Sequence, residues 1–143
     1  MATIINKFGT MQGWNSIMCN LLGRDVEGFT TLKYTDNVDK QNVKGGGMYP
    51  IGRSQSNYEA EASITLYKEE VDAIRKSLPP GKRLQDIAPF DITVDYVNDE
   101  GVITRDRIRT CEFTNAGNEV SQGDGTIALE YKLIISHIEY NVI

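Results

Sequence analysis

The sequence has only two cysteines and one histidine among its 143 residues. Cys19 and Cys111 lie far apart without a CxxC spacing, which predicts neither a disulfide framework nor a thiolate metal site. The histidine, His137, shares strand phase with Leu133 and Ile135, so we expect it at the edge of a core face. No partner motif for a catalytic triad stands near it. We therefore expect no metal, no other cofactor and no histidine-based catalysis.

Long apolar runs and an excess of positive charge are also missing. The first residues, MATIINKFGT, lack the charged region and apolar stretch of a signal peptide, and no segment has the apolar length of a membrane helix. We expect a chain made in the cytosol that does not insert into a membrane. The formal net charge of -5 argues against a domain built to grip phosphates, because that affinity comes from clustered lysine and arginine.

One glycine-rich stretch has the spacing of a nucleotide-binding loop. From Gly47 the sequence is GMYPIGRS, a P-loop pattern with Arg53 in place of the lysine. Such a loop must follow a buried strand and open a helix, whose first amides hold the phosphates. Polar residues precede this stretch, and an alternating strand pattern follows it. The context therefore excludes the nucleotide interpretation and favours a mobile loop at an assembly or ligand surface.

Length and patterning predict one domain over residues 1–143, rich in strands. Residues 58–66, YEAEASITL, alternate as a half-buried strand does, and KEEVDAIRKSL predicts a helix at about 68–78. A hairpin is expected at 14–34, a meander of strands with a turn at 98–101 follows the helix, and IALEYKLIISHIEY reads as one last strand. Residues 35–57, without apolar period, are expected to form a long loop. The fold class is mainly β: an antiparallel β-sandwich or barrel with one flanking helix.

Two groups of charged residues could in principle carry chemistry. Glu59 and Glu61 lie two residues apart on one strand, where a solvated face is a simpler interpretation than acid–base catalysis. Arg105, Arg107 and Arg109 form a basic stripe without the aromatic neighbours of a nucleic-acid site. We expect these arginines to meet acids, a neighbouring subunit being one source, which makes them possible interface charges. No catalytic constellation results, and we predict that the protein is not an enzyme.

The run from Pro50 to Ile74, PIGRSQSNYEAEASITLYKEEVDAI, resembles the tail tube proteins of long-tailed bacteriophages. In that family a Gly-Arg pair within a long loop precedes a strand that ends in an aliphatic–aromatic pair, here Leu66 and Tyr67, and a short helix follows. The order of hairpin, glycine-rich loop, strand, helix and strands is also similar. The likeness extends loosely to the closing IALEYKLIISHI segment.

This resemblance implies a structural protein of the virion tail, assembled in the bacterial host cytoplasm. The chain would form six-membered rings that stack into a hollow tube, through which DNA leaves the capsid without specific binding. Its partners would be other copies of itself and further tail proteins, namely the tape measure, the terminator and a sheath where one exists. An acidic chain suits a channel that passes DNA, because like charge avoids phosphate contacts.

Specific residues follow from this interpretation. We expect Glu59 and Glu61 to line the lumen, with Glu130 as a weaker candidate. The glycine-rich loop would be mobile in the monomer and ordered against the next subunit or ring through its apolar anchors. The predicted inter-subunit residues are Gly45, Gly46, Gly47, Met48, Tyr49, Ile51 and Arg53.

Two alternatives remain open from the sequence. A related ring protein, such as a secretion-system tube or a terminator at the head–tail joint, would share the fold and differ in partners. A small-ligand-binding or enzymatic β-barrel would use the acidic face as a pocket and the glycine loop as a lid. Oligomeric state separates the second alternative from the first, because only a tube or ring protein forms rings or filaments.

Overall fold

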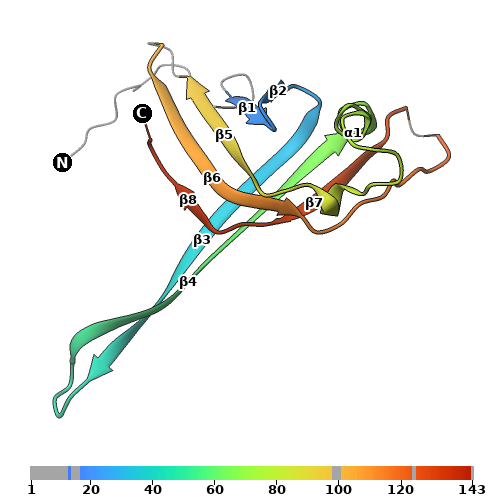
Figure 1. The fold of residues 1–143 in the computed structure, drawn as a ribbon. Helices are drawn as coiled ribbons and strands as arrows, with labels where there is room; N and C mark the ends of the chain where they lie inside the picture. Colours follow the sequence, from blue (N-terminus) through green and yellow to red (C-terminus); the bar gives the residue numbers. More distant parts are fainter. Residues whose placement is uncertain (1–12, 14–16, 98–100, 124, 143) are drawn as a thin grey trace.

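A computed structural model describes residues 13, 17–97, 101–123 and 125–142. Antiparallel strands dominate, with a single α-helix and one 3-10 turn among these residues (Figure 1). In chain order the elements are β1 (Ile17–Leu21), β2 (Arg24–Val26), β3 (Phe29–Lys44), β4 (Pro50–Tyr67), α1 (Lys68–Lys76), η2 (Leu84–Asp86), β5 (Phe90–Val97), β6 (Ile103–Phe113), β7 (Ala128–Ile134) and β8 (His137–Glu139).

The strands form one bent sheet in the order β2-β1-β5-β6-β7-β4-β3, with β8 paired to β6. The bend is at β6, which pairs with β5 up to Cys111 and with β7 through Glu112 and Phe113. The two ends of the sheet thus belong to two different layers, as in a curled sandwich or barrel. The predicted fold class, mainly β with one flanking helix, is confirmed.

A β-bulge marks the bend. The register between β5 and β6 shifts between Phe90 and Ile92, and Thr110 adopts a left-handed backbone conformation with φ of 56°. Such a φ is strained for a β-branched residue. The side chain of Asp91 compensates, because it accepts hydrogen bonds from the Thr110 backbone N–H (3.0 Å) and from Arg109 Nη1 (2.8 Å).

The core lies between the facing layers. In the last part of β4 alternate residues point inward, as the sequence predicts, so that Ala62, Ile64 and Leu66 are buried. The largest fully buried side chains are Tyr131, Leu21, Ile64, Leu66, Leu84, Ile92, Ile108, Val71 and Val94. These residues come from both layers and from the helix, so one continuous core holds the two layers and the helix together.

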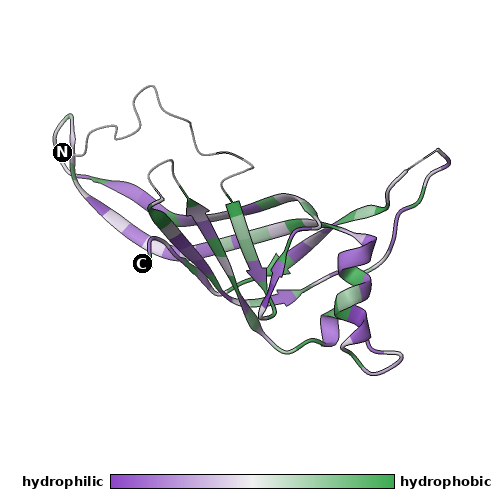
Figure 2. Cartoon of the chain, turned by 90° about the horizontal axis from the view of Figure 1, so that it is seen from above, coloured by the Kyte–Doolittle hydropathy of each residue, from purple (hydrophilic) through white to green (hydrophobic). Residues whose placement is uncertain are grey.

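Helix α1 covers one end of this core. Val71 and Ile74 are buried, with acids in the first turn and bases in the last, which suits the helix dipole. In Figure 2 the helix accordingly shows hydrophobic bands between hydrophilic stretches. Glu70 fixes the helix beside β2, since it accepts from the Gly28 backbone N–H at 3.2 Å and forms an ion pair with Arg24.

The long loop predicted at 35–57 is wrong. Residues 35–44 belong to β3 and residues 50–57 to β4, and the two strands pair from Phe29 with Leu66 out to Lys44 with Pro50. Only residues 45–49 connect them. Beyond the body the hairpin projects alone, and every residue from 37 to 59 is exposed (Figure 1). We call residues 37–59 the arm.

Two further strand predictions need correction. In the hairpin expected at 14–34, β1 pairs with the short β2 and with β5, whereas GFTTLKY opens β3 and pairs with β4. Trp14 lies outside the described residues, as does most of the turn expected at 98–101. The closing segment forms two strands, because β7 ends at Ile134 and β8 begins at His137. Between them the backbone N–H of Ser136 donates a hydrogen bond to the carbonyl of Arg109 at 3.0 Å.

Candidate assembly site

The tip of the arm gathers the residues that the sequence marked for contact between subunits. Met48, Tyr49 and Ile51 are 87%, 76% and 74% exposed, and they lie at or beside the 45–49 turn. Large apolar side chains this exposed and this close together are typical of a surface that another molecule covers. Arg53 lies just behind them, where its Nε donates to Asn42 Oδ1 at 3.2 Å.

The outer part of the arm is basic. Residues 40–58 include Lys40, Lys44 and Arg53 and contain no acid. None of these three cations forms an ion pair with any residue that the structure describes. The arm therefore carries a small apolar tip behind which three positive charges face water, although the chain as a whole is acidic.

The root of the arm is fixed to the body by two tyrosines and one aspartate. Tyr58 and Tyr140 both donate to Asp36, at 2.9 Å to Oδ2 and 3.2 Å to Oδ1. The hydroxyl of Tyr58 in turn accepts from the backbone N–H of Ile138 at 3.2 Å. The segment that follows β7 thus holds the direction in which the arm leaves the body.

A second, deeper network lies beside the root. Tyr34 donates to Asp106 Oδ2 at 2.6 Å, and its hydroxyl lies 2.6 Å from that of Tyr96. Asp106 Oδ1 accepts from the backbone N–H of Asn141 at 3.1 Å. Asp106 is only 9% exposed. Burial of the Tyr34 side chain, together with its hydrogen bond to Asp106, raises the pKa of Tyr34 above its ordinary value. The network therefore joins β3, β5, β6 and the segment after β8.

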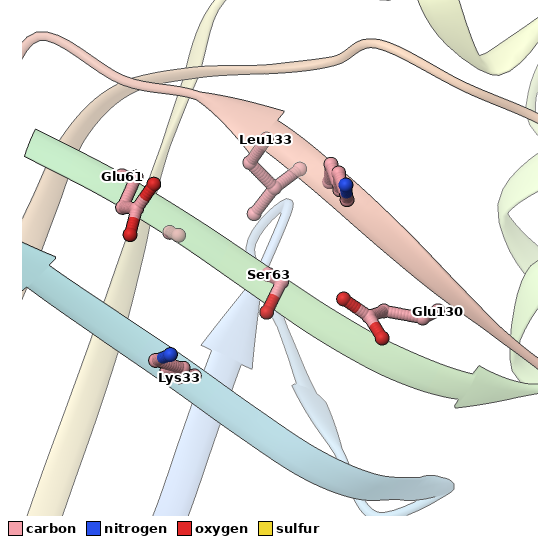
Figure 3. Close-up of a pocket in the computed structure, with 7 residues that line it drawn as sticks. Lys33, Glu61, Ser63, Glu130 and Leu133 are labelled. Carbon is pink, nitrogen blue, oxygen red and sulfur yellow. The ribbon is translucent and has the colours of Figure 1, made fainter.

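The predicted lumen residues share the solvent face of the β3-β4-β7 layer. In the strand register Glu61 lies opposite Thr35 and Ile134. Glu59 lies opposite Asn37, and Glu130 lies opposite Thr65. All three glutamates have the strand phase that points away from the core. Figure 3 shows Glu61, Ser63 and Glu130 together with Lys33 on three adjacent strands. Around Ser63 the surface forms a groove of about 290 Å³.

This face is of mixed charge. Lys33 and Lys132 lie on either side of Ser63 in the strand register, between the rows that hold Glu61 and Glu130. Glu112 joins the same face through its pairing with Ile134. Four glutamates therefore stand beside two lysines among the described residues of this face. The face is acidic on balance but is not the purely negative wall that Glu59, Glu61 and Glu130 alone suggest.

The arginine stripe has partners within the chain. Arg105 pairs with Asp95 at 2.7 Å, and Arg109 pairs with both Asp91 at 2.8 Å and Glu139 at 3.0 Å. Arg107 lies on β6 opposite Thr93 and Glu139 in the register. Arg105 and Arg109 therefore meet acids of the same subunit, whereas Arg107 has an acid opposite it only in the strand register.

The single histidine is exposed, so its predicted place at the edge of the core is wrong. The break at Ser136 shifts the strand phase, which turns Ile138 inward and His137 outward. His137 Nδ1 lies 3.0 Å from Ser136 Oγ and Nε2 lies 3.3 Å from Glu139 Oε1. These side chains are open to water, and the same Glu139 carboxylate is bound by Arg109.

Other chemical features can be stated for the described part of the chain. It contains no group of three or more histidine, cysteine or acidic side chains placed to hold a metal ion. Both cysteines are unpaired and buried, and burial raises the pKa of each thiol to about 12. No helix in the same residues has the length and apolar character to cross a membrane.

Comparison with known proteins places the fold. The chain resembles a chain in the structure of the anti-feeding prophage cap, a tube terminating cap, with a TM-score of 0.62 and 14% identity over 87% of both chains. A chain in the extended sheath–tube complex of an extracellular contractile injection system, PVC, has a TM-score of 0.57 and 14% sequence identity, over 90% of this chain and 89% of the other. A chain in the 6-fold symmetrised anti-feeding prophage baseplate has a TM-score of 0.54 and 7% sequence identity, over 87% of this chain and 89% of the other.

No family model matches the sequence, and no curated protein matches it. At 14% identity or less the likeness shows the fold alone, and that fold extends over most of this chain and of each neighbour. This shared fold agrees with the resemblance found in the sequence.

Sequence reasoning missed the tyrosine–aspartate network at the root of the arm. One signal was present: in TRDRIRTC, Asp106 has the same phase as Ile108, the buried phase of β6. An aspartate in that phase needs a buried partner. The partner is Tyr34, which is 72 residues away in the sequence, so only the fold identifies it.

Proposed function

We propose that this protein is a structural subunit of a phage-tail-like particle, which assembles into stacked six-membered rings around a hollow channel.

 The observation that carries the proposal is the arm, because an isolated chain gives its apolar tip nothing to contact. Neighbours of the same fold come from a sheath–tube complex, a tube terminating cap and a baseplate described with six-fold symmetry. A heterologous contact between identical subunits closes into a ring when the rotation allows, and rings can then stack.

The remaining parts of the proposal concern the channel. We place Glu59, Glu61 and Glu130 on its wall, because the face that carries them is turned away from the core and has more acids than bases. Such a wall would let DNA pass without specific binding, since phosphates find few unopposed cations there. The role is structural rather than enzymatic, and the protein belongs in the tail of the particle after assembly in the bacterial host cytoplasm.

A second candidate function is that of a cap or terminator, which ends a tube instead of extending it. The tube terminating cap has the highest TM-score of the three neighbours described above, 0.62 against 0.57 for the sheath–tube complex. A terminator stops at one ring, whereas a tube protein adds ring upon ring. The partners would then be the tube itself and the proteins that close it, rather than the tape measure and sheath.

Electron microscopy of the purified full-length protein over a range of concentrations tests both candidates. Long hollow tubes support the tube subunit, and single rings that never stack support the terminator. A chain that remains a monodisperse monomer under every condition, including seeding with a tail initiator complex, contradicts both and returns the ligand-binding barrel to consideration.

A further inference from the structure

A groove lies at the end of the body where β1 extends beyond β2. Its volume is about 410 Å³, within the range of ligand-binding pockets. The buried side chains of Cys19, Val26 and Phe29 line it together with Ile17. Met18, which is 52% exposed, also borders the groove, so apolar side chains form one part of its lining.

Two acids stand at this groove. Asp25 and Glu27 both line it, and both are exposed. Asp25 accepts a hydrogen bond from Asn20 Nδ2 at 3.1 Å, but neither acid forms an ion pair with a residue that the structure describes. The groove thus combines an apolar floor with two negative charges that no cation of the described chain neutralises.

The arm tip has the complementary character. It presents Met48, Tyr49 and Ile51 to water, with Lys44 and Arg53 immediately behind them. Apolar side chains can fill an apolar groove while the cations approach the acids, and burial of the apolar surface supplies most of the affinity. Opposite charges would mainly fix the orientation and speed the encounter.

A chain cannot place its own arm tip in its own groove. Phe29, which lines the groove, is the first residue of β3, and Lys44 at the arm tip is the last of its 16 residues. At about 3.3 Å per residue the strand separates the two points by roughly 50 Å. Figure 1 shows the arm tip and the β1–β2 end on opposite sides of the molecule.

We propose that the groove lined by Ile17, Met18, Asp25, Glu27 and Phe29 receives the arm tip of a second copy of this chain. The contact is heterologous, because each subunit offers its arm to one neighbour and its groove to another, so the subunits join head to tail. This inference rests on the proposed function and names the surface to which the arm binds.

Cysteine cross-linking tests the contact directly. Full-length Glu27→Cys protein is mixed with full-length Tyr49→Cys protein of a distinguishable mass and oxidised. We expect a mixed disulfide several-fold more abundant than in the matched control, Val120→Cys with Tyr49→Cys, because a disulfide needs Cα atoms within about 7 Å. Val120 is also exposed but lies on another loop, and the buried Cys19 and Cys111 compete poorly. Equal cross-linking of both mixtures overturns the proposal.

Charge reversal gives a second, independent measurement. Asp25→Lys with Glu27→Lys should weaken self-association, and so should Lys44→Glu with Arg53→Glu, as sedimentation velocity can record. All four changes in one chain should restore association, which also shows that neither pair had merely prevented folding. Failure of the fourfold variant to recover, when its circular dichroism matches that of the unmodified chain, overturns the proposal.

These results separate the docking surface from the proposed function. Tubes that form without the Glu27–Tyr49 cross-link leave the function intact and remove this groove as the binding surface. A specific cross-link with charge rescue, in a protein that forms no ring or tube, supports the docking surface and removes the proposed function.

Discussion

The hydroxyl of Tyr34 lies 2.6 Å from Oδ2 of Asp106 and donates to it, which connects β3 at the root of the arm to β6 in the opposite layer. Asp106 also holds the backbone of Asn141. A buried carboxylate with two such partners is well satisfied, and loss of one partner leaves an oxygen away from water. The direction of the arm therefore depends on the same bonds that stabilise the body.

Replacement of Tyr34 by phenylalanine should destabilise the protein. The change removes the donor to Asp106 and leaves the ring in place, so we expect the free energy of unfolding to fall by about 1–3 kcal/mol. Urea unfolding of both proteins measures this change in the free energy of unfolding. Tyr49→Phe is the matched control, because Tyr49 is at the exposed arm tip and its change should stay within about 0.5 kcal/mol. Equal stability of the two variants would show that water replaces the Tyr34 hydroxyl.

Acid should weaken the bend of the sheet. The backbone N–H of Thr110 and the Arg109 guanidinium lower the pKa of Asp91, and Arg109 lowers the pKa of Glu139. A depressed pKa in the folded state means that the stabilisation is complete above the unfolded pKa, about 4, and is lost as pH falls through the folded value.

The free energy of unfolding should accordingly decrease as the pH falls below about 4. Asp91→Asn should show a smaller decrease over the same range than the unmodified chain. Asp39→Asn, on the arm and away from the bulge between β5 and β6, should follow the unmodified chain. Identical pH profiles for all three proteins would exclude Asp91 as a source of the acid sensitivity.

The arm tip should be required for assembly and dispensable for folding. Lys44 pairs with Pro50, so residues 45–49 can be replaced by an Asn-Gly turn that closes the hairpin without the apolar tip. We expect a monomer with unchanged thermal stability that forms neither rings nor tubes in electron micrographs. Normal tubes from this variant would show that the 45–49 turn is only a connection.

Reversal of the acidic face should change DNA affinity and leave folding intact. Glu59→Lys with Glu61→Lys adds two cations beside Lys33 and Lys132 on the solvent face, and neither glutamate belongs to the core. We expect assembled protein that binds DNA with strong salt dependence, measured by filter retention between low and high salt. Glu69→Lys with Glu119→Lys makes the same change of net charge elsewhere on the surface.

The two double variants identify the wall of the channel. Binding that appears only with the changes at Glu59 and Glu61 supports their place in the lumen. Equal binding by both variants, in assemblies of equal length, contradicts it, because total charge alone would then explain the affinity.

The sequence predicted those elements that have one face in the core. Residues 58–66 alternate because Ala62, Ile64 and Leu66 are buried while Glu59 and Glu61 face water, and α1 shows its buried face through Val71 and Ile74. The arm has both faces in water, so its strands carry no alternation, and the sequence pattern predicts a loop there. Backbone hydrogen bonds between β3 and β4 define it, and side-chain periodicity cannot reveal those bonds.

The candidate site was predictable to a similar extent. The apolar residues of the 45–49 turn and its surroundings stood out because they are large and occur among glycines and polar residues. The Tyr34–Asp106 bond and the groove at Asp25 depend on the path of the chain between distant segments, which no local pattern contains.

The exposed edge of the sheet at β3 has a consequence for solubility before assembly. The strand order ends at β3, whose 16 residues offer a long edge to any other strand, a known route to aggregation. β-Bulges interrupt this strand between Val38 and Lys40 and again between Val43 and Lys44, and Lys33, Lys40 and Lys44 place charge along it. Irregular spacing and lysines both oppose indiscriminate strand addition. The edge is thereby protected against amyloid-like growth while newly made subunits accumulate.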